Sequence, residues 1–249
     1  MNNLILGDCL KELKDIRTQS IDAIITDPPY GISFMNNKWD YDVPSVQIWK
    51  ECFRVLKFGG HLLSFSSART YHRLVCNVED AGFEIRDQIL WIYGTGFPKS
   101  LNIGKAVDKK QGNERKSLGM YDPRSLQDGA NRTKRPIGNQ QVANYESSMV
   151  ERTKGNSEWE GWGTALKPAH EPIVLARKPL SEKNVVENVL KHNNGGINID
   201  GCRVGNEEKT HKGMSSFGVL HDDNWKPKDI EVTSQGRFPA NLIHDGNSN

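Results

Sequence analysis

The sequence is poor in cysteine, and this limits the redox and metal chemistry it can support. Its 249 residues contain four cysteines, Cys9, Cys52, Cys76 and Cys202, and no two of them have Cys-x-x-Cys spacing. No histidine cluster lies near any of them, so a zinc site is not indicated and no metal is expected. We expect reduced thiols, partly buried in a core.

Long apolar runs are also missing. No stretch approaches the roughly 20 apolar residues that a membrane span needs, and the first residues lack the basic and apolar regions of a signal peptide. Hydrophobic residues make up 36% of the chain, below the roughly 45–50% of an average soluble domain. The sequence therefore predicts a cytoplasmic protein without membrane contact.

A strong charge of one sign is absent too. The 33 Lys and Arg nearly balance the 31 Asp and Glu, giving a net charge of +2, which excludes an acidic tail or a strongly cationic arm. The balance conceals a segregation, because residues 99–169 carry 13 basic and 8 acidic side chains whereas both flanks are slightly acidic. Local charge governs nucleic-acid binding more than the sum does.

Strand and helix patterns alternate along much of the chain. Apolar runs predict strands over 4–6, 21–26, 61–66, 83–93 and 171–176. Helical spacing predicts helices over 9–15, 45–56, 70–81 and 181–191, with Phe58-Gly59-Gly60 ending the second. Residues 99–169 and 200–249 have no sustained period and are expected to be rich in loops. The alternation indicates an α/β fold with a mostly parallel sheet.

One tetrapeptide, Asp27-Pro28-Pro29-Tyr30, is placed where chemistry would be expected. Two prolines cannot continue a strand ladder, so the strand over 21–26 must end there. Open α/β sheets bind ligands at the carboxyl ends of their strands. An isolated tetrapeptide of this kind would more often be an exposed turn, but its position after a strand makes it a candidate site.

Five blocks in order resemble one enzyme family. They are Gly7–Leu13, Ser20–Gly31, Cys52–Gly60, Trp91–Ser100 and Lys167–Pro172. On these blocks the chain resembles the amino-methylating DNA methyltransferases, which modify adenine N6 or cytosine N4 with S-adenosylmethionine. It is similar to the permuted branch, in which the catalytic motif precedes the cofactor motif. The form Asp-Pro-Pro-Tyr, rather than Ser-Pro-Pro-Tyr, favours adenine N6.

The resemblance implies a Rossmann-like methyltransferase fold and a site-specific enzyme of restriction-modification type, encoded by a prokaryote or a phage. Asp27 and the carbonyl of Pro28 would accept hydrogen bonds from the exocyclic amine, Pro29 would help to hold them rigidly, and Tyr30 would stack on a base flipped out of the duplex. The alternatives are that Asp27 only caps the turn and that Tyr30 belongs to the core.

The resemblance also implies a cofactor crevice for S-adenosylmethionine. Asp8 matches the family position that contacts the adenine ring of the cofactor, and it could equally cap a helix, or do both. Ser64, Phe65 and Ser66, which end the third predicted strand, would line the same crevice.

The basic middle segment is the predicted contact with double-stranded DNA. Its candidate phosphate-binding residues are Arg115, Lys116, Arg124, Arg132, Lys134 and Arg135. The alternative is a solvated, disordered insertion. The predicted organisation is a catalytic half over 1–98, a basic target-recognition insertion over 99–169, and a return strand and helix with a loop-rich tail over 170–249.

The family's cofactor motif, Phe-x-Gly-x-Gly after a strand, has no convincing counterpart, and two strands of the expected sheet are not found. Three interpretations stay open. The chain is an active enzyme whose cofactor half is unusual or supplied by a second polypeptide; it is a truncated, inactive fragment; or it is a nucleic-acid-binding module without chemistry. In each case an incomplete sheet would leave an open edge, so a second chain or a dimer covering it is expected.

Overall fold

The computed structural model describes residues 3–33, 38–94, 96, 100–121, 150–214 and 229–244. The chain divides into two compact units. One contains residues 1–91 and 171–243, and the other contains residues 92–170 and 244–249. The segment predicted as a basic insertion, 99–169, lies within the second unit.

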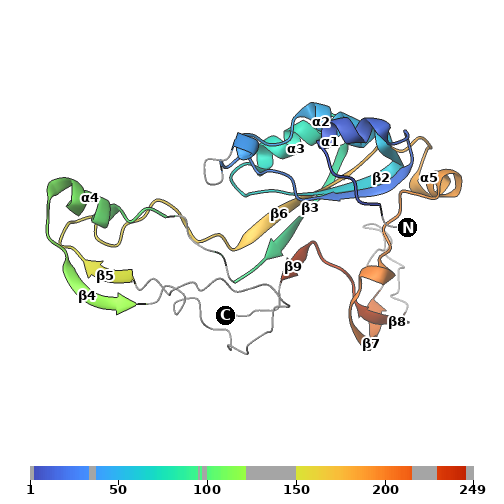
Figure 1. Ribbon diagram of the computed structural model, residues 1–249. Helices are drawn as coiled ribbons and strands as arrows, with labels where there is room; N and C mark the ends of the chain where they lie inside the picture. Colours follow the sequence, from blue (N-terminus) through green and yellow to red (C-terminus); the bar gives the residue numbers. More distant parts are fainter. Residues whose placement is uncertain are drawn as a thin grey trace, which may run out of the picture. The chain divides into compact units, whose positions relative to one another are not determined.

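The first unit is built on a five-stranded sheet. Its order is β1 (Ile21–Thr26), β2 (Leu56–Phe65), β6 (His170–Arg177), β3 (Glu84–Ile92) and β9 (Leu242–His244). Strands β1 and β2 are parallel, whereas β6 runs antiparallel to β2. Figure 1 shows β6 beside β3 in this sheet. The predicted α/β class is confirmed, and the sheet is mixed.

The direction of β6 follows from how the chain returns to the sheet. Arg177, which ends β6, is paired with Glu84, which begins β3, at 2.6 Å. At the opposite ends of these strands, the backbone N–H of Tyr93 donates to the carbonyl of Ala169. The returning strand therefore begins where β3 ends and runs back along it, which a helical crossover between parallel strands would not give.

Three helices cover one face of the sheet (Figure 1). They are α1 (Cys9–Glu12), continued by a 3-10 turn over Leu13–Asp15, α2 (Val46–Val55) and α3 (Tyr71–Asp80). Trp49 from α2 and Leu74 from α3 are fully buried with Leu62 and Val174 of the sheet. Burial of such side chains contributes about 1.5–3 kcal/mol each, so the two helices predicted over 45–56 and 70–81 supply much of this core.

Gly59 and Gly60 do not end a helix as expected. Helix α2 ends at Val55, and both glycines lie inside β2, where the pairing with β1 shifts register between Ile21 and Ala23. Gly59 has φ +77°, and a Cβ there would meet Nδ2 of Asn188 at 2.7 Å. The glycine therefore admits Asn188 of α5 (Val185–His192), whose side chain donates to the carbonyl of Phe58.

A buried lysine closes the end of α2. Nζ of Lys178 donates to the carbonyls of Phe53 and Leu56 at 2.7 and 2.8 Å, and it lies over the ring of Phe53. The last carbonyls of a helix have no partner within it, so this ammonium satisfies groups that would otherwise be buried without one. Burial lowers the pKa of Lys178.

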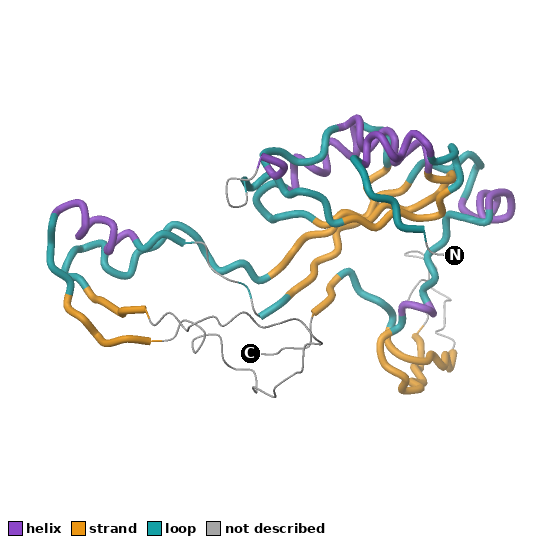
Figure 2. Tube along the Cα trace, viewed as in Figure 1, coloured by secondary structure: helices purple, strands orange, loops and turns teal. Residues whose placement is uncertain are grey.

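Two sequence predictions about regular structure were wrong in the first unit. Residues 4–6 form no strand, and Leu4 and Leu6 are 100% and 98% exposed, because no described strand pairs with them. Residues 200–249 are more regular than expected: β7 (Val204–Met214) and β8 (Asp229–Arg237) form an antiparallel pair, visible in Figure 2, and β9 joins the main sheet. Polar strands that pair only with each other carry no hydrophobic alternation to detect.

The second unit also has regular structure where a loop was expected. Helix α4 (Ile103–Gln111) is followed by β4 (Lys116–Tyr121), which pairs antiparallel with β5 (Val150–Lys154). Asn102 caps α4 by accepting from the N–H of Lys105 at 2.8 Å, and Gly112 ends it in the left-handed region. The alternative of a wholly disordered insertion therefore does not hold for its described residues.

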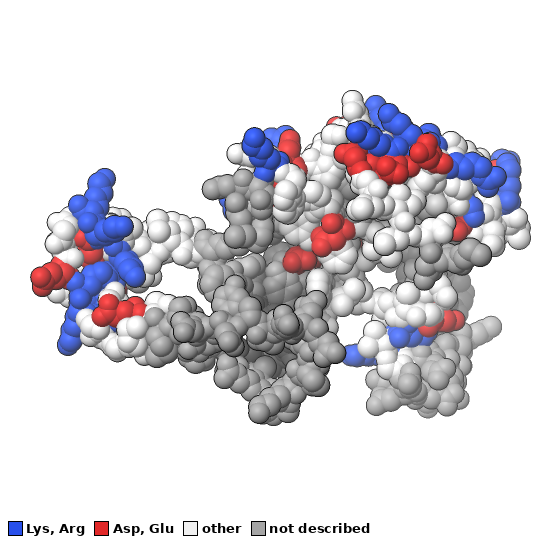
Figure 3. Space-filling view, in the orientation of Figure 1, with Lys and Arg blue, Asp and Glu red and all other residues white. Residues whose placement is uncertain are grey.

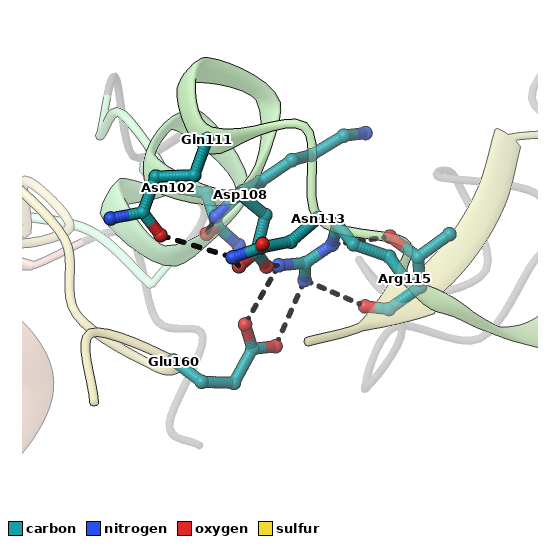
Figure 4. A network of polar contacts seen from close by, with 8 residues as sticks. Asn102, Asp108, Gln111, Asn113, Arg115 and Glu160 are labelled. Carbon is teal, nitrogen blue, oxygen red and sulfur yellow. Dashed lines mark hydrogen bonds and ion pairs between the residues drawn. The ribbon is translucent and has the colours of Figure 1, made fainter. Parts of the chain in front are cut away.

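An ion-pair cluster holds the second unit together. The guanidinium of Arg115 pairs with Asp108 of α4 and Glu160, and it donates to the hydroxyl and the carbonyl of Thr153 in β5 (Figure 4). The side chains of Arg115 and Asp108 are 10% and 1% exposed. Because a buried carboxylate requires a partner, Arg115 joins α4, β5 and the Glu160 segment.

Candidate functional site

The Asp27–Tyr30 turn lies at the carboxyl edge of the sheet. Strand β1 ends at Thr26, which is paired with Ser64 of the parallel strand β2. The ends of both strands therefore lie at one edge, which brings Asp27–Tyr30 beside Ser64–Ser66. The family resemblance had placed Ser64–Ser66 in the cofactor crevice, and the structure brings their strand end to the edge that carries Asp27–Tyr30.

The turn is held by contacts on its far side. Gly31 has φ +67°, and a Cβ there would meet the backbone N of Val43 at 2.8 Å. The N–H of Gly31 donates to Oδ1 of Asp40 at 2.8 Å, and Asp40 is buried. A larger residue at position 31 would strain the backbone, so the glycine and Asp40 fix the direction in which the chain leaves the site.

Tyr30 is fixed at both its backbone and its side chain. Its carbonyl accepts a hydrogen bond from the Thr70 hydroxyl at 2.5 Å, and its own hydroxyl donates to Oε2 of Glu171 at 3.3 Å. Thr70 lies just before α3, and Glu171 is the second residue of β6. The ring is half-buried, so part of one aromatic surface is available at the edge of the sheet.

The electrostatics of this cluster oppose ionisation of the phenol. Burial raises the pKa of Tyr30, and the neighbouring carboxylates of Asp27 and Glu171 raise it further through hydrogen bonding and charge. Burial also raises the pKa of Glu171, and the charge of Asp27 adds to this, while the hydrogen bond from Tyr30 lowers it. Two carboxylates therefore face one hydroxyl that stays protonated.

Glu171 and Thr70 were not among the site residues predicted from the sequence. Glu171 stands within one of the five resembling blocks, yet the block gives no sign that its side chain reaches Tyr30. The available signal was an ionisable residue near the start of an apolar strand, at the edge where a ligand is expected. Thr70 carried no signal beyond a place near the start of a helix.

The predicted cofactor residues differ in their surroundings. Oδ1 of Asp8 accepts from the N–H groups of Leu10 and Lys11, so Asp8 caps α1 as one alternative stated. Ser64 and Ser66 are fully buried, and the Ser64 hydroxyl donates to the carbonyl of Phe65. Among the described residues, the hydroxyl of Ser66 is buried without a hydrogen-bond partner. A buried hydroxyl is normally paired, so Ser66 fits a contact with a bound ligand.

Phe65 belongs to the opposite side of the strand. Its ring meets that of Trp91 edge to face, with centroids 6.0 Å apart. Successive side chains of a strand point to opposite faces, so Phe65 and the two buried serines do not share one face. The three residues are neighbours at the edge of the sheet without forming a single wall.

Of the predicted DNA-binding residues, two lie among the residues that the structure describes and four lie outside them. Arg115 is paired with Asp108 and Glu160 inside its unit, and it also lines a surface pocket. Lys116 is exposed in the same unit. The other four, Arg124, Arg132, Lys134 and Arg135, lie outside the described residues.

A basic surface pocket lies beside Arg115. It is lined by Lys105 and Lys109 of α4, Asn113 and Arg115, and by Val150, Glu151 and Thr153 of β5. Figure 3 shows Lys and Arg side chains gathered over this unit. The pocket was not predicted, because α4 itself was not.

Cys52 is buried and the other three cysteines are exposed, all as free thiols. Within the described ranges, no three His, Cys, Asp or Glu side chains are grouped as metal ligands would be. None of the described helices combines the length and apolar character required to cross a membrane.

A family model for N6- and N4-type methyltransferases, described as DNA methylase, matches residues 21–245. The type II methyltransferase M.HindIII of Haemophilus influenzae is 25% identical over 274 aligned positions, covering 93% of this chain and 72% of that protein. M.HinfI of Haemophilus influenzae is 29% identical over 113 residues, covering 36% of this chain and 31% of that protein.

Solved structures show a weaker similarity. A complex of M1.HpyAVI with SAM is 17% identical, with a TM-score of 0.36, and the match covers 74% of this chain and 57% of that one. The cytosine-N4-specific PvuII DNA methyltransferase is 13% identical, with a TM-score of 0.39, covering 98% and 56%. The chain spans little more than half the length of these solved relatives.

Proposed function

The chain belongs to the DNA methylase family of N6- and N4-type amino-methyltransferases, and from this premise we propose that it takes part in S-adenosylmethionine-dependent methylation of an exocyclic amine in double-stranded DNA. The observation that carries the proposal is the Asp27–Tyr30 turn, held at the carboxyl edge of the sheet by Glu171 and Thr70. Adenine N6 is favoured over cytosine N4 by the Asp-Pro-Pro-Tyr form of the motif.

The chemistry requires acceptors rather than a strong base. The amine of a nucleobase is conjugated with the ring, so its lone pair is a poor nucleophile. Asp27 and the carbonyl of Pro28 would accept its two hydrogen bonds and favour the pyramidal nitrogen, on which positive charge develops as the new N–C bond forms. The S–CH3 bond of the methyl donor would break with its electron pair staying on sulfur, and the nitrogen would pass one proton to Asp27 or to solvent water. Pro28 and Pro29 restrict the backbone that carries these acceptors.

The target atom cannot be reached inside a duplex, so the base must be flipped out. Tyr30 is suited to receive it, because its backbone is fixed by Thr70 and its hydroxyl by Glu171. A half-buried ring held in this way offers one face for stacking at little cost in side-chain entropy.

S-adenosylmethionine, when bound, supplies a methyl group activated by its sulfonium. Ser66 is the residue best fitted to contact it, since its hydroxyl is buried with no partner among the described residues, at the edge that also carries Asp27. Asp8 would contribute its carboxylate, whose two described bonds both use Oδ1. Ser64 and Phe65 would contribute to the same edge.

The second unit is proposed to contact the DNA backbone. Lys105, Lys109 and Lys116 are exposed, and the first two line one surface pocket. Phosphate contacts position a protein on DNA and do not read its sequence, so this surface would orient the duplex. Any base contacts of Arg124, Arg132, Lys134 and Arg135 remain predictions from the sequence. Such an enzyme, encoded by a prokaryote or a phage, would act on DNA in the cytoplasm.

A second candidate function is favoured by the exposed edge of the first unit. Strand β1 is at the end of the described sheet, Ile25 is 72% exposed, and Leu4 and Leu6 are almost fully exposed. An unpaired apolar edge invites association. In this alternative the chain is a DNA-binding fragment that is inactive by itself, or it needs a second polypeptide for the cofactor site.

Calorimetric titration with S-adenosylmethionine separates the two. Binding at micromolar affinity supports a cofactor site within this chain, whereas no detectable heat supports the alternative. Transfer of a radiolabelled methyl group to DNA then tests catalysis, and Asp27→Ala should abolish labelling. Equal labelling by both proteins would remove Asp27 from the mechanism. Chromatography of the digested DNA separates N6-methyladenine from N4-methylcytosine.

A further inference from the structure

The hydroxyl of Tyr30 interacts with two carboxylates. It donates to Oε2 of Glu171 at 3.3 Å, and Asp27, a second acceptor nearby, raises its pKa through hydrogen bonding and charge. A hydroxyl has a single hydrogen to donate. Donation to one carboxylate therefore excludes donation to the other.

Glu171 is well placed to hold that hydrogen. The next residue, Pro172, is fully buried, and its carbonyl accepts from the N–H of Ser66 at 3.0 Å. The antiparallel ladder between β2 and β6 then continues from the pair Phe65 and Ile173. The backbone of Glu171 is thus tied to the sheet, whereas Asp27 is exposed on the turn after β1.

Which carboxylate accepts the hydroxyl hydrogen of Tyr30 matters for the proposed chemistry. An Asp27 carboxylate that accepts from Tyr30 has fewer lone pairs for the target amine, and its negative charge is partly satisfied beforehand. When Glu171 accepts the hydrogen, only lone pairs of the Tyr30 oxygen face Asp27. The oxygens of the Asp27 carboxylate then stay available to accept hydrogen bonds from the target amine.

We infer that Glu171 is a positioning residue, which takes the hydroxyl hydrogen of Tyr30 and so keeps the Asp27 carboxylate available to accept hydrogen bonds from the target amine. The inference rests on the proposed function, since it assumes that Asp27 binds the amine. It adds a residue that acts only through Tyr30 and has no contact with the base or the cofactor in this role.

The pKa values of Tyr30 and Glu171 are both raised. The raised pKa of Tyr30 keeps its hydrogen in place, so the hydroxyl has one to donate. The pKa of Glu171 is raised by burial and by Asp27 and lowered by the bond from Tyr30. Removing that bond would make the ionised form of Glu171 harder to maintain.

The test uses four proteins: wild type, Glu171→Met, Tyr30→Phe and the double variant. Methionine is similar in length to glutamate but accepts hydrogen bonds only weakly. If Glu171 acts through the hydroxyl, Glu171→Met lowers the methyl-transfer rate about tenfold, a loss typical of a hydrogen bond to a charged group. Tyr30→Phe, which keeps the ring, costs about threefold or less.

The double variant decides the inference. Without the hydroxyl, Glu171 has nothing to hold, so the double variant should transfer methyl groups at the rate of Tyr30→Phe and faster than Glu171→Met alone. A double variant as slow as Glu171→Met, or slower, would overturn the inference. Glu79→Met, on the exposed side of α3 in the same unit, is the matched control and should leave the rate unchanged.

A second readout needs no catalysis. The carboxyl carbon-13 resonance of Asp27, assigned by its loss in Asp27→Asn, reports hydrogen bonds to that carboxylate. Tyr30→Phe should leave it unmoved in the wild-type background and shift it in the Glu171→Met background. If it shifts equally in both, the inference fails even when the wild type is active.

The two proposals fail in different ways. Methyl transfer by the wild type no greater than by Asp27→Ala contradicts the proposed function, whereas the carbon-13 comparison still reports where the Tyr30 hydrogen goes. Should Glu171→Met not fold, Glu171→Gln replaces it. Its neutral carbonyl accepts a hydrogen bond more weakly than a carboxylate, so Glu171→Gln should lower the methyl-transfer rate less, and adding Tyr30→Phe should restore the rate again. A rate that Tyr30→Phe does not restore would contradict the inference.

Discussion

The hydroxyl of Tyr30 donates a hydrogen bond to Oε2 of Glu171, across 141 positions of sequence. The contact joins the turn after β1 to the strand that returns from the second unit. The candidate site is therefore assembled from segments that precede and follow the second unit in the sequence, and the return strand β6 is part of it.

The methyl-transfer rate should fall as the pH is lowered, because Glu171 becomes protonated. Its pKa is raised, so it takes up a proton at a higher pH than an ordinary glutamate as the pH falls. The protonated form accepts the Tyr30 hydrogen less well, and the hydroxyl turns to Asp27. A pH–rate profile should show this loss in the wild type, and Glu171→Gln should lack that limb. An identical acid limb in both proteins would assign it to another group.

The same ionisation should cost stability. A carboxyl whose pKa is higher in the folded state binds its proton more tightly when folded, so its contribution to stability decreases as the pH rises through that pKa. Glu171→Gln should therefore raise the unfolding temperature at neutral pH, and the gain should shrink as the pH falls. Thermal unfolding at several pH values measures this. A gain that is independent of pH would contradict the explanation.

Ser66→Ala should weaken the binding of S-adenosylmethionine about threefold to tenfold, the value of one hydrogen bond. Because the hydroxyl has no described partner, its removal should not lower the stability of the free protein. Calorimetry and thermal unfolding measure the two quantities. Ser157→Ala is a matched control, since its hydroxyl is also buried without a partner but lies in the second unit. Equal binding by both variants would exclude Ser66 from the cofactor site.

Replacing Lys105 and Lys109 with alanine should reduce the salt dependence of DNA binding. Each phosphate contact contributes about 0.9 to the slope of log affinity against log salt on duplex DNA, so the double variant should lose about 1.8 of that slope. Lys11 and Lys14, exposed on the first unit, provide the matched control pair. An unchanged slope in the Lys105 and Lys109 variant would mean that this pocket does not contact phosphate.

Arg115→Ala should destabilise the second unit. Asp108 is almost fully buried beside Arg115, and a buried carboxylate that loses its partner is unfavourable. Thermal unfolding should show a midpoint lower by several degrees, with the loss concentrated in the second unit. Lys116→Ala, at the exposed neighbouring position, should have little effect. If Arg115→Ala lost DNA affinity without losing stability, its role would be the phosphate contact predicted from the sequence.

The sequence by itself determined the α/β class, the limits of β1 and the position of the Asp-Pro-Pro-Tyr motif at the end of that strand. These are local properties: an apolar run followed by two prolines has few other solutions. It also predicted the helices over 45–56 and 70–81, whose apolar side chains pack on the sheet in the core.

Only the tertiary structure decided the rest. The sequence predicted that Gly59 and Gly60 end a helix. They lie instead in β2, where Asn188 from α5 approaches the backbone. The sequence predicted Arg115 as a DNA contact, and only the structure shows that Asp108 and Glu160 pair with it inside its unit. Glu171 carried no sign of its contact with Tyr30. The sequence reports what each segment can form, whereas the pairing of distant side chains is set by how the strands meet.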